Sequence, residues 1–432
     1  MNNAAALKKA YRLLSAVLRE GAYIHIALRN ARLMPDERAF VTRLVKGVVE
    51  RSAELDAAVA ALTEKPPKQD LRLILKIGIY LQRYMDIPDY AATDETVALA
   101  KALGKGGASG FVNAVLNRAL TLPRAVEVSP ALPAWLCKKL CARFGEPECA
   151  ALCAAFSAEN NRGIHVRLAP VFARSETARA LISSEVGAFT PSIQGFSYYY
   201  VTHSTAKHMT DSLPKGSFFV QNLGSCLVCI AAQNAAAAAG VPAKNILDVC
   251  AAPGGKAVYL AQLFPAARVV ARDVHAHRVR LTRYYVADAG MSNIEVEQGD
   301  ATVPRREDEG QFDLVLADVP CSGFGVLARR ADVALRRKEE DVAALAALQR
   351  DILAASAHAV APGGVLVYAT CTLLAEENDD VCNAFLAAHS ASFEALPVAL
   401  PVPFFPVGAY AQLLPTVSGC DAFFIAAFRR LA

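Results

Sequence analysis

Two cysteines that follow apolar runs are the residues of this chain with the clearest capacity for chemistry. Cys321 stands in the turn 318–323, which begins with an acid and follows the run 312–317, and Cys371 follows the run 364–370. Runs of this length that end in polar or small residues predict buried strands. In open α/β sheets, ligands bind at the edge formed by the carboxyl ends of the strands. The sequence therefore predicts two thiols and a carboxylate at one edge.

Such thiols suit nucleophilic catalysis. A thiolate that adds to a substrate divides one difficult step into easier ones, and it needs surroundings that lower its pKa. We expect Lys256 to contribute to these surroundings, and Asp318 to stabilise negative charge that develops on a substrate. Because both cysteines end strands, local chemistry leaves open which of them attacks. Two inert thiols in a packed core are the alternative interpretation.

A loop of small residues, 250–256, joins a predicted strand to a predicted helix. Small residues let a ligand approach the backbone, and the helix start offers free N–H groups. A P-loop needs Ser or Thr at Ala257, and the glycine pattern of dinucleotide sites is missing. Acids end the next three strands, which suits the ribose, adenine and amino-acid parts of S-adenosyl-L-methionine. The expected cofactor-binding residues are Cys250, Ala251, Ala252, Pro253, Gly254, Gly255, Lys256, Asp273, Arg278, Asp300 and Asp318.

Strand and helix patterns alternate from residue 216 onward. This alternation predicts an α/β domain with a largely parallel sheet that helices cover on both faces. A closing antiparallel pair is expected around 411–414 and 423–428. The predicted strands are 245–249, 268–273, 294–298, 312–317 and 364–370. The predicted helices are 257–264, 275–289, 341–360 and 377–388.

The region before residue 216 has a different pattern. Residues 1–125 show helical periodicity and predict an all-helical domain, with one helix at 71–85, another capped by Asp94 over 95–103, and a last one from Phe111. The glycine loop beside Lys105 is either a phosphate contact or a plain turn. Residues 126–215 predict a linker and a small α+β segment, and 216–432 form the α/β domain.

Composition bounds the possible functions. The chain has 432 residues and 46.0 kDa, which predicts two or three domains. Its 54% hydrophobic and 20% charged content excludes a disordered protein. Residues 1–125 carry 19 basic and 12 acidic side chains, against 26 and 29 in the remainder. This excess is compatible with a polyanionic partner or with a solvated helical surface.

The cysteines and the termini indicate the compartment. The chain starts without the apolar core of a signal peptide, and the alanine-rich run 231–239 is too short to span a bilayer. We therefore expect a cytoplasmic protein with free thiols and no membrane partner. Pairs at four-residue spacing favour core thiols over a zinc site, and no metal is expected. These pairs are Cys137, Cys141, Cys149 and Cys153.

Three phrases resemble the signature motifs of the RNA cytosine-5 methyltransferases: 250–256, 318–325 and 367–378. The phrases 84–88 and 110–116 resemble the NusB-like helical domain that is fused to such an enzyme. The resemblance covers nearly the whole chain, and with the fused helical domain the chain is most similar to the RsmB/Sun/Fmu group of small-subunit rRNA enzymes. It departs from the family pattern at Ala257 and in the middle segment.

The resemblance implies a fold and a reaction. The fold is a Rossmann-like class I methyltransferase domain after a NusB-like, all-α RNA-binding domain and a small α+β RNA-binding segment. The reaction is S-adenosyl-L-methionine-dependent formation of 5-methylcytosine in 16S rRNA. In this family, the position of Cys371 is the nucleophile that adds to C6 of cytosine, and that of Cys321 assists release, with Asp318 and Lys256 completing the catalytic set. A monomer is expected, and the sequence leaves open whether rRNA is met before full subunit assembly.

Two other functions remain in view. One is methylation of cytosine in tRNA or large-subunit rRNA, and the other is a non-catalytic RNA-binding assembly or antitermination factor. The basic runs 329–330 and 336–338 follow the Cys321 turn and predict either phosphate contacts or a solvated surface.

Overall fold

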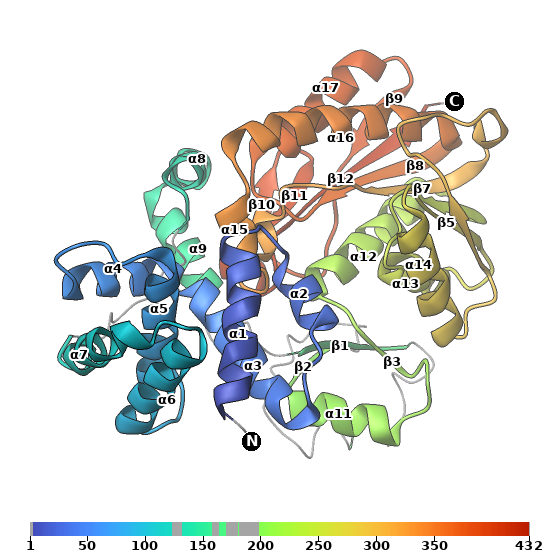
Figure 1. Cartoon of the computed structure of the whole chain (residues 1–432). Coiled ribbons are helices and arrows are strands. Elements are labelled where there is room, and N and C mark those ends of the chain that lie inside the picture. The colour runs from blue at the N-terminus through green and yellow to red at the C-terminus, as the bar shows by residue number, and fades with distance from the viewer. Residues whose placement is uncertain (1–2, 123–131, 158–163, 170–179, 181–197, 432) are drawn as a thin grey trace. The chain divides into compact units, whose positions relative to one another are not determined.

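The computed structural model describes residues 3–122, 132–157, 164–169, 180 and 198–431, and Figure 1 shows their helices and strands. Two compact units emerge. The helical unit comprises Met1–Cys137 with Leu327–Arg337, and the sheet unit comprises Lys138–Val326 with Lys338–Ala432. Within the described ranges, no helix is both long and apolar enough to cross a membrane.

The helical unit is built around α5 (Gln69–Tyr84), close to the predicted 71–85. Ten consecutive residues of α5, Leu73–Gln82, are buried because α1, α3, α4, α6 and α7 all contact this helix. Gly47 of α3 permits one close contact, since a β-carbon there would overlap the ring of Tyr80. The other helices are α1 (Asn3–Leu18), α2 (Ile24–Asn30), α3 (Pro35–Glu50), α4 (Ser52–Leu62), α6 (Asp89–Ala102), η1 (Gly106–Ala108) and α7 (Ser109–Ala119).

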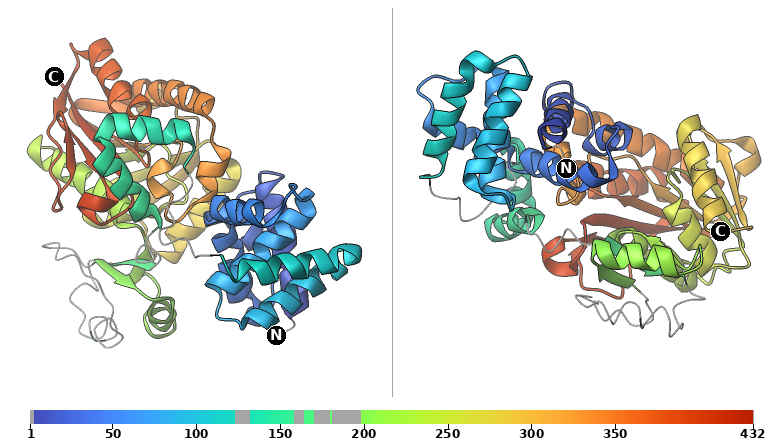
Figure 2. Two further views of the ribbon diagram at one scale, coloured as in Figure 1. Left: turned by 90° about the vertical axis from the view of Figure 1, so that its left-hand side faces the viewer. Right: turned by 60° about the horizontal axis from the view of Figure 1, so that its bottom comes forward.

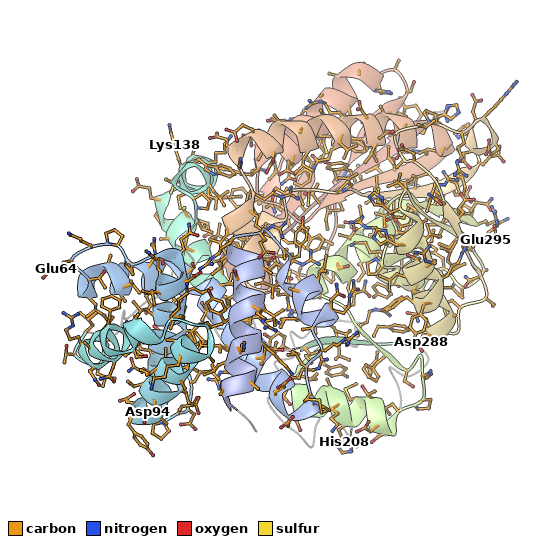
Figure 3. The ribbon with its side chains drawn as sticks, in the orientation of Figure 1. Glu64, Asp94, Lys138, His208, Asp288 and Glu295 are labelled. Atoms are coloured by element: carbon orange, nitrogen blue, oxygen red, sulfur yellow. The ribbon has the colours of Figure 1, made fainter. Side chains whose placement is uncertain are left out.

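The predicted cap at Asp94 is wrong. Helix α6 begins at Asp89, directly after Pro88, and Asp94 is an exposed residue inside the helix (Figure 3). A proline is compatible with a helix start but not with a helix interior, and Asp89 places a negative charge in the first turn. The proline was therefore the better signal for the start of this helix.

Lys105, beside the glycine loop, forms an ion pair within the helical unit. Its Nζ lies 2.8 Å from Oδ2 of Asp70. Asp70 Oδ1 also accepts hydrogen bonds from Arg19 at 2.8 Å and from the Tyr11 hydroxyl at 3.1 Å. These donors, Lys105 foremost, lower the pKa of Asp70. A phosphate at this loop would have to compete with Asp70 for the lysine.

The segment Leu327–Arg337 belongs to the helical unit although it follows the Cys321 turn in sequence. It contains α15 (Asp332–Arg336), in which buried Asp332 accepts a hydrogen bond from the backbone N–H of Ile24 at 3.4 Å. The guanidinium of Arg336 lies 3.6 Å from the centre of the Tyr23 ring. Arg336 thus packs on an aromatic ring, an outcome that neither interpretation of the basic run had anticipated.

The sheet unit contains the predicted parallel sheet, in the order β8-β7-β4-β5-β6. The predicted closing pair is confirmed as β11 and β12: β12 pairs antiparallel with β8, and β11 pairs antiparallel with β12. Strands β9 and β10 were not predicted. The parallel strands are β4 (Asn245–Asp248), β5 (Arg268–Asp273), β6 (Ile294–Gln298), β7 (Phe312–Asp318) and β8 (Val360–Thr370). The antiparallel strands are β9 (Phe393–Leu396), β10 (Phe405–Val407), β11 (Tyr410–Leu413) and β12 (Phe423–Arg430).

Helices cover both faces of this sheet (Figure 2). Helices α12 (Leu223–Ala238) and α13 (Gly255–Leu263) share a core with one face, and α16 (Glu339–Ala359) and α17 (Asp379–His389) with the other. Alternate residues of β7 enter the two cores, with Leu314 and Leu316 in one and Val315 and Ala317 in the other. This burial on both sides explains the continuous apolar run in the sequence. Helix α14 (Ala276–Asp288) packs against β5 and β6.

A smaller sheet, in the order β2-β1-β3, precedes the large one. Its strands are β1 (Ile164–Leu168), β2 (Tyr198–Val201) and β3 (Phe218–Val220), and α11 (His203–Ser212) packs against β1. Parts of the predicted 126–215 segment lie outside the described residues, namely 126–131, 158–163, 170–179 and 181–197.

Helices α8 (Ala134–Phe144) and α9 (Glu146–Ser157) carry the four spaced cysteines. Cys149 is buried, the other three are half-buried, and none of these four cysteines forms a disulfide. Arg143 of α8 forms an ion pair with Asp379 of α17 at 2.5 Å. Nowhere in the described ranges do three or more His, Cys, Asp or Glu side chains gather as a metal site would require.

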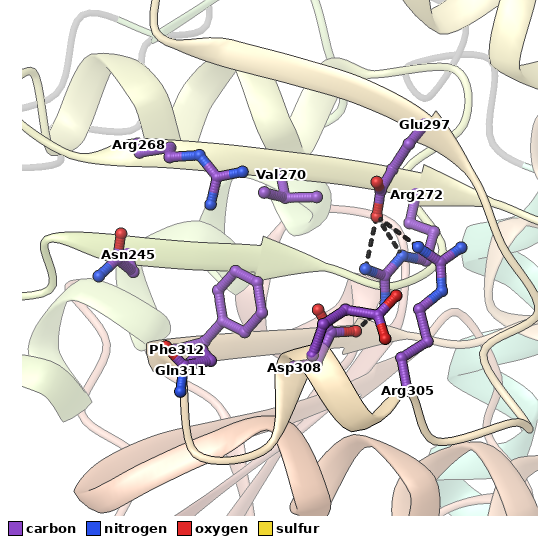
Figure 4. A pocket seen from close by; sticks show the side chains of 10 residues that line it. Asn245, Arg268, Val270, Arg272, Glu297, Arg305, Asp308, Gln311 and Phe312 are labelled. Atoms are coloured by element: carbon purple, nitrogen blue, oxygen red, sulfur yellow. Dashed lines mark hydrogen bonds and ion pairs between the residues drawn. The ribbon is translucent and has the colours of Figure 1, made fainter.

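A cavity of about 320 Å³ lies beside β4, β5 and β7, and arginines and acids line it (Figure 4). Arg272 pairs with Asp308 at 2.7 Å and with Glu297 at 2.5 Å, and Arg305 lies 3.2 Å from Glu297. The side chains of Arg272 and Asp308 are only 7% and 11% exposed. Neither cysteine nor the predicted cofactor loop lines this cavity.

Removing one partner of this buried pair should destabilise the sheet unit. Asp308→Ala leaves Arg272 with Glu297 alone, so we expect the free energy of unfolding to fall by about 3 kcal/mol, the lower end for a broken buried pair. Urea unfolding measures this change. Glu295→Ala is the matched control because its pair with Arg268 is solvent-exposed (Figure 3) and should change stability by less than about 1 kcal/mol. Equal effects of the two variants would contradict this assignment.

Candidate active site

The strand order places all the predicted site loops at one edge of the sheet. Strand β4 lies between β5 and β7, so the chain moves outward from β4 in both directions. Lys256 lies in the first turn of the helix that follows β4, Asp273 ends β5, and Cys321 and Cys371 lie in the turns after β7 and β8. Open parallel sheets bind ligands at such a reversal of strand order. The fold therefore gathers the predicted residues where a ligand crevice is expected.

The loop after β4 is folded tightly against its neighbours. Gly254 has φ +110°, and a β-carbon there would come within 3.2 Å of Thr282 and 3.4 Å of Tyr285 on α14. The N–H of Gly254 donates to the carbonyl of Ala251 at 2.7 Å, and the N–H of Ala251 donates to the backbone carbonyl of Arg272 at 2.8 Å. Helix α13 begins at the next residue, so its amino-terminal N–H groups lie at the end of this loop.

The predicted acids at the strand ends lie in different surroundings. Asp273 is buried, accepts a hydrogen bond from the N–H of His275 at 3.0 Å, and lies 3.8 Å from the guanidinium of Arg278. Asp300 is exposed and accepts hydrogen bonds from the backbone N–H and the hydroxyl of Thr302, which lower its pKa. The structure thus brings Arg278 to Asp273 and holds Asp300 in a local turn.

Lys256 and Asp318 form an ion pair between the loops of β4 and β7. Nζ of Lys256 donates to Oδ2 of Asp318 at 2.6 Å and lies 5.4 Å from the centre of the Phe423 ring. Burial by itself would lower the pKa of Lys256, but the charge and the hydrogen bond of Asp318 outweigh burial and raise it. The lysine is therefore a fixed positive charge at this edge of the sheet.

The two predicted cysteines lie against each other. The Sγ atoms of Cys321 and Cys371 are 3.2 Å apart, and the backbone N–H of Cys371 donates to Sγ of Cys321 at 3.3 Å. The hydrogen bond with Cys371 and burial together raise the pKa of Cys321 well above its usual value. In this arrangement Cys321 is a protonated thiol, which is a poor nucleophile but a possible proton carrier.

A glycine holds the two cysteine loops close together. The N–H of Gly325 donates to the carbonyl of Cys371 at 2.9 Å, and the N–H of Ala422 donates to the carbonyl of Gly325 at 2.9 Å. A β-carbon at Gly325 would collide with both the Ala422 and Cys371 carbonyl oxygens. The close backbone approach therefore requires glycine at this position.

Comparison with known proteins identifies the family. The chain is 34% identical over 430 residues to the ribosomal RNA small subunit methyltransferase B of Xanthomonas campestris, across 96% of this chain and 95% of that protein. The chain belongs to the ribosomal RNA small subunit methyltransferase B family. The family member from Pseudomonas syringae is 32% identical over 454 residues, across 100% of this chain and 98% of that protein.

Domain-level and structural comparisons agree with this membership. Residues 236–429 match the 16S rRNA methyltransferase RsmB/F family, and residues 4–121 match the NusB family. The crystal structure of PH0851 superposes with a TM-score of 0.77 at 19% identity, across 99% of this chain and 98% of that one. The crystal structure of NSun6 from Pyrococcus horikoshii with SFG superposes with a TM-score of 0.57 at 20% identity, across 70% of this chain and 99% of that one. The predicted fold class, a Rossmann-like methyltransferase unit with a NusB-like helical unit, is confirmed.

Sequence reasoning missed two buried acids in this member of the methyltransferase B family. Asp248 ends β4 and is fully buried, with Oδ1 accepting from the N–H of Cys250 at 3.4 Å. The signal that selected Asp273, an acid at a strand end, applies equally to Asp248. Glu377 was assigned only to the start of a helix, and the structure places it, fully buried, among the residues that flank the cysteines. The signal that could have identified Glu377 is its position inside the phrase 367–378, which also contains Cys371.

Asp248 gives this family member a pH-dependent stability. Burial foremost, then the charge of Asp318, raises the pKa of Asp248 to about 7, whereas an aspartate in an unfolded chain loses this proton near its ordinary pKa of 3.8. Folding therefore takes up a proton between these pH values, and the wild-type stability falls as pH rises through that window. We expect the unfolding free energy of Asp248→Asn, relative to wild type, to rise between pH 5 and pH 8.

Urea unfolding at several pH values, without added ligand, measures this difference. Asp300→Asn is the matched control, because the pKa of Asp300 is lowered and its contribution is already complete at pH 5. A constant difference between Asp248→Asn and wild type across this range would show that Asp248 is not held protonated.

Proposed function

We propose that the protein transfers a methyl group from S-adenosyl-L-methionine to C5 of a cytosine in 16S rRNA, through a covalent bond between Cys371 and C6 of the base. The observation that carries this proposal is the pair of thiols 3.2 Å apart at the ends of adjacent parallel strands. The pair shares the sheet edge with the Lys256–Asp318 ion pair. Membership in the methyltransferase B family supports the substrate class.

Two observations at the end of β4 fit a bound cofactor. Oδ2 of buried Asp248 has no hydrogen-bond partner among the described residues, and α13 begins directly after Gly254, so that its amino-terminal N–H groups lie at the end of this loop. We assign the loop Cys250–Lys256 to the cofactor as a whole, Asp273 with neighbouring Arg278 to the ribose, Asp300 to the adenine amine, and Asp318 to the amino-acid end. The bound cofactor supplies an electrophilic methyl group on a sulfonium.

Cys371 acts first on the base. C5 of cytosine is a weak nucleophile, and a thiolate that adds to C6 moves electron density onto C5. Asp318, sharing a proton with N3 of the base, stabilises the negative charge that develops on the ring, and the fixed charge of Lys256 favours the thiolate form of Cys371. The cytosine must leave its stack to reach these groups.

Cys321 completes the cycle. Its hydrogen bond with Cys371 is the largest cause of its raised pKa. Once the sulfur of Cys371 is bonded to C6, it no longer carries the negative charge that this hydrogen bond stabilises, so Cys321 can release its own proton to solvent and then, as a thiolate, accept the C5 proton. Loss of this proton restores the double bond and breaks the bond between sulfur and C6. The product and a free Cys371 thiolate result.

The remaining parts of the chain serve the RNA. We assign contacts with rRNA to the NusB-like unit, whose sequence is basic, and to the small sheet that precedes the methyltransferase sheet. The proposal places the protein in the cytoplasm as a monomer, without a metal ion.

Single substitutions separate the roles of the two thiols. In Cys371→Ala, we expect methylation to fall by more than about 10³-fold because the nucleophile is lost. In Cys321→Ala, addition still occurs but elimination stalls, so the enzyme should accumulate on RNA as an adduct that survives denaturing electrophoresis. Cys141→Ala, at a half-buried thiol of α8, serves as the control and should leave turnover unchanged. Turnover by Cys371→Ala would overturn the assignment of the nucleophile.

Mapping of 5-methylcytosine in a deletion strain tests the substrate. Loss of the mark from 16S rRNA, and its return with the wild-type gene but not with Cys371→Ala, is the expected result. Loss from tRNA or large-subunit rRNA would redirect the proposal to those RNAs. An unchanged map, together with no binding of S-adenosyl-L-methionine to the purified protein, would favour an RNA-binding assembly factor.

A further inference from the structure

A buried carboxylate lies behind the two catalytic loops. Glu377 is the last residue of η5 (Ala375–Glu377), just before α17, and its side chain is fully buried. No step of the reaction described above uses it. A buried acid is costly unless its oxygens are hydrogen-bonded, so its partners indicate what it does.

The partners of Glu377 are the neighbours of the two cysteines. Oε2 accepts a hydrogen bond from the backbone N–H of Ser322 at 2.8 Å, and Oε1 lies 3.4 Å from the hydroxyl of Thr372. The hydroxyls of Ser322 and Thr372 lie 2.7 Å from each other. Ser322 follows Cys321 and Thr372 follows Cys371 in the sequence. One carboxylate therefore joins the two loops directly beside the sulfur-bearing residues.

A second layer holds this carboxylate in place. Gln349 of α16 donates to Oε2 of Glu377 at 2.9 Å and to the carbonyl of Pro320 at 2.9 Å, on the other side of Cys321. The hydroxyl of Tyr368 donates to the backbone carbonyl of Glu377 at 2.6 Å. Since Gln349, Pro320 and Tyr368 come from α16, the β7 loop and β8, the helix layer and both strands fix the position of the carboxylate.

The charge of Glu377 acts on Cys321. The side-chain donors to its carboxylate are neutral groups, and within the described part of the chain no ion pair includes Glu377. A negative charge without a cation in a region of low dielectric acts strongly on its neighbours. The titratable groups that raise the pKa of Cys321 are Cys371 at the end of β8 and Glu377 in η5, in addition to burial.

We propose that Glu377 is a positioning residue that joins the two cysteine loops at the spacing required for proton transfer between base and Cys321, and that its charge acts together with the hydrogen bond between the two thiols to keep Cys321 a thiol until Cys371 has attacked. The proposal rests on the proposed function, because it concerns the roles of the same two thiols. It adds a reason why two chemically identical side chains 3.2 Å apart behave differently: only Cys321 is flanked on both sides by the network of this carboxylate.

Glu377→Gln in the full-length protein tests the proposal, with Glu376→Gln as the matched control. Glu376 is the adjacent acid, but it is partly exposed and paired with Lys139 on α8. We expect kcat of Glu377→Gln to fall by about 10²-fold, as for an ångström-scale misplacement of reacting groups, with KM for RNA and for S-adenosyl-L-methionine within about twofold of wild type. A general disturbance of the fold would instead weaken cofactor binding as well.

A second readout needs neither RNA nor cofactor. Iodoacetamide alkylates thiolates, and mass spectrometry of the peptides gives separate rates for Cys321 and Cys371 between pH 7 and pH 11.5, a range that extends well above the ordinary pKa of a thiol. In Glu377→Gln, the midpoint for Cys321 should move to lower pH, whereas in Glu376→Gln it should stay at the wild-type value. Thr372→Val removes a hydroxyl of the network and leaves the charge, so it should lower kcat without moving that midpoint.

The outcomes distinguish this proposal from the proposed function. Wild-type-like kcat in Glu377→Gln would reject the positioning role, and an unchanged Cys321 midpoint would reject the role of the charge. If wild type forms no 5-methylcytosine, the proposed function fails. The alkylation rates would still report whether Glu377 controls Cys321.

Discussion

The parallel pairing of β7 with β8 is the constraint on which this site depends. The register sets Asp318 opposite Ala369, and the N–H of Val319 extends the pairing to the carbonyl of Ala369 at 3.0 Å. The two strands therefore end at the same level of the sheet, and the turns that follow them carry Cys321 and Cys371. A shift of one residue would turn every side chain of a strand to the opposite face. The register of β7 with β8 therefore fixes the level at which the two sulfur-bearing turns leave the sheet.

Electrostatics then gives each group at the edge its own chemistry. Lys256 is held charged by Asp318, the pKa of Asp248 is raised to about 7 by burial and by the neighbouring acid, and Cys321 is held protonated by its partners. These effects require surroundings that exclude water, since in bulk solvent the same charges would interact weakly. The packing of α12 and α13 on one face and of α16 and α17 on the other provides such surroundings.

The sequence predicted the framework of the sheet unit and much of its site. Apolar runs located β4, β5, β7 and β8, because a parallel sheet buried on both faces leaves such runs, whereas the half-exposed edge strand β6 was located by its alternation of apolar and polar residues. The short strands β9 and β10 carried no such signal. The prediction of a cap at Asp94 is wrong because an acidic side chain is a weaker signal of a helix start than the proline that precedes Asp89. The roles of Arg336 and Glu377 depend on long-range contacts with Tyr23 and Ser322, which no local pattern contains.

The most direct test of the account is to locate the covalent bond. A small-subunit rRNA transcript that contains 5-fluorocytidine should trap the enzyme in the presence of S-adenosyl-L-methionine, because fluorine at C5 blocks the elimination that frees the sulfur. Peptide mapping of the denatured complex identifies the residue that carries the nucleotide. The account predicts a linkage on Cys371. A linkage on Cys321, or no linkage from a preparation that methylates the unsubstituted transcript, would contradict it.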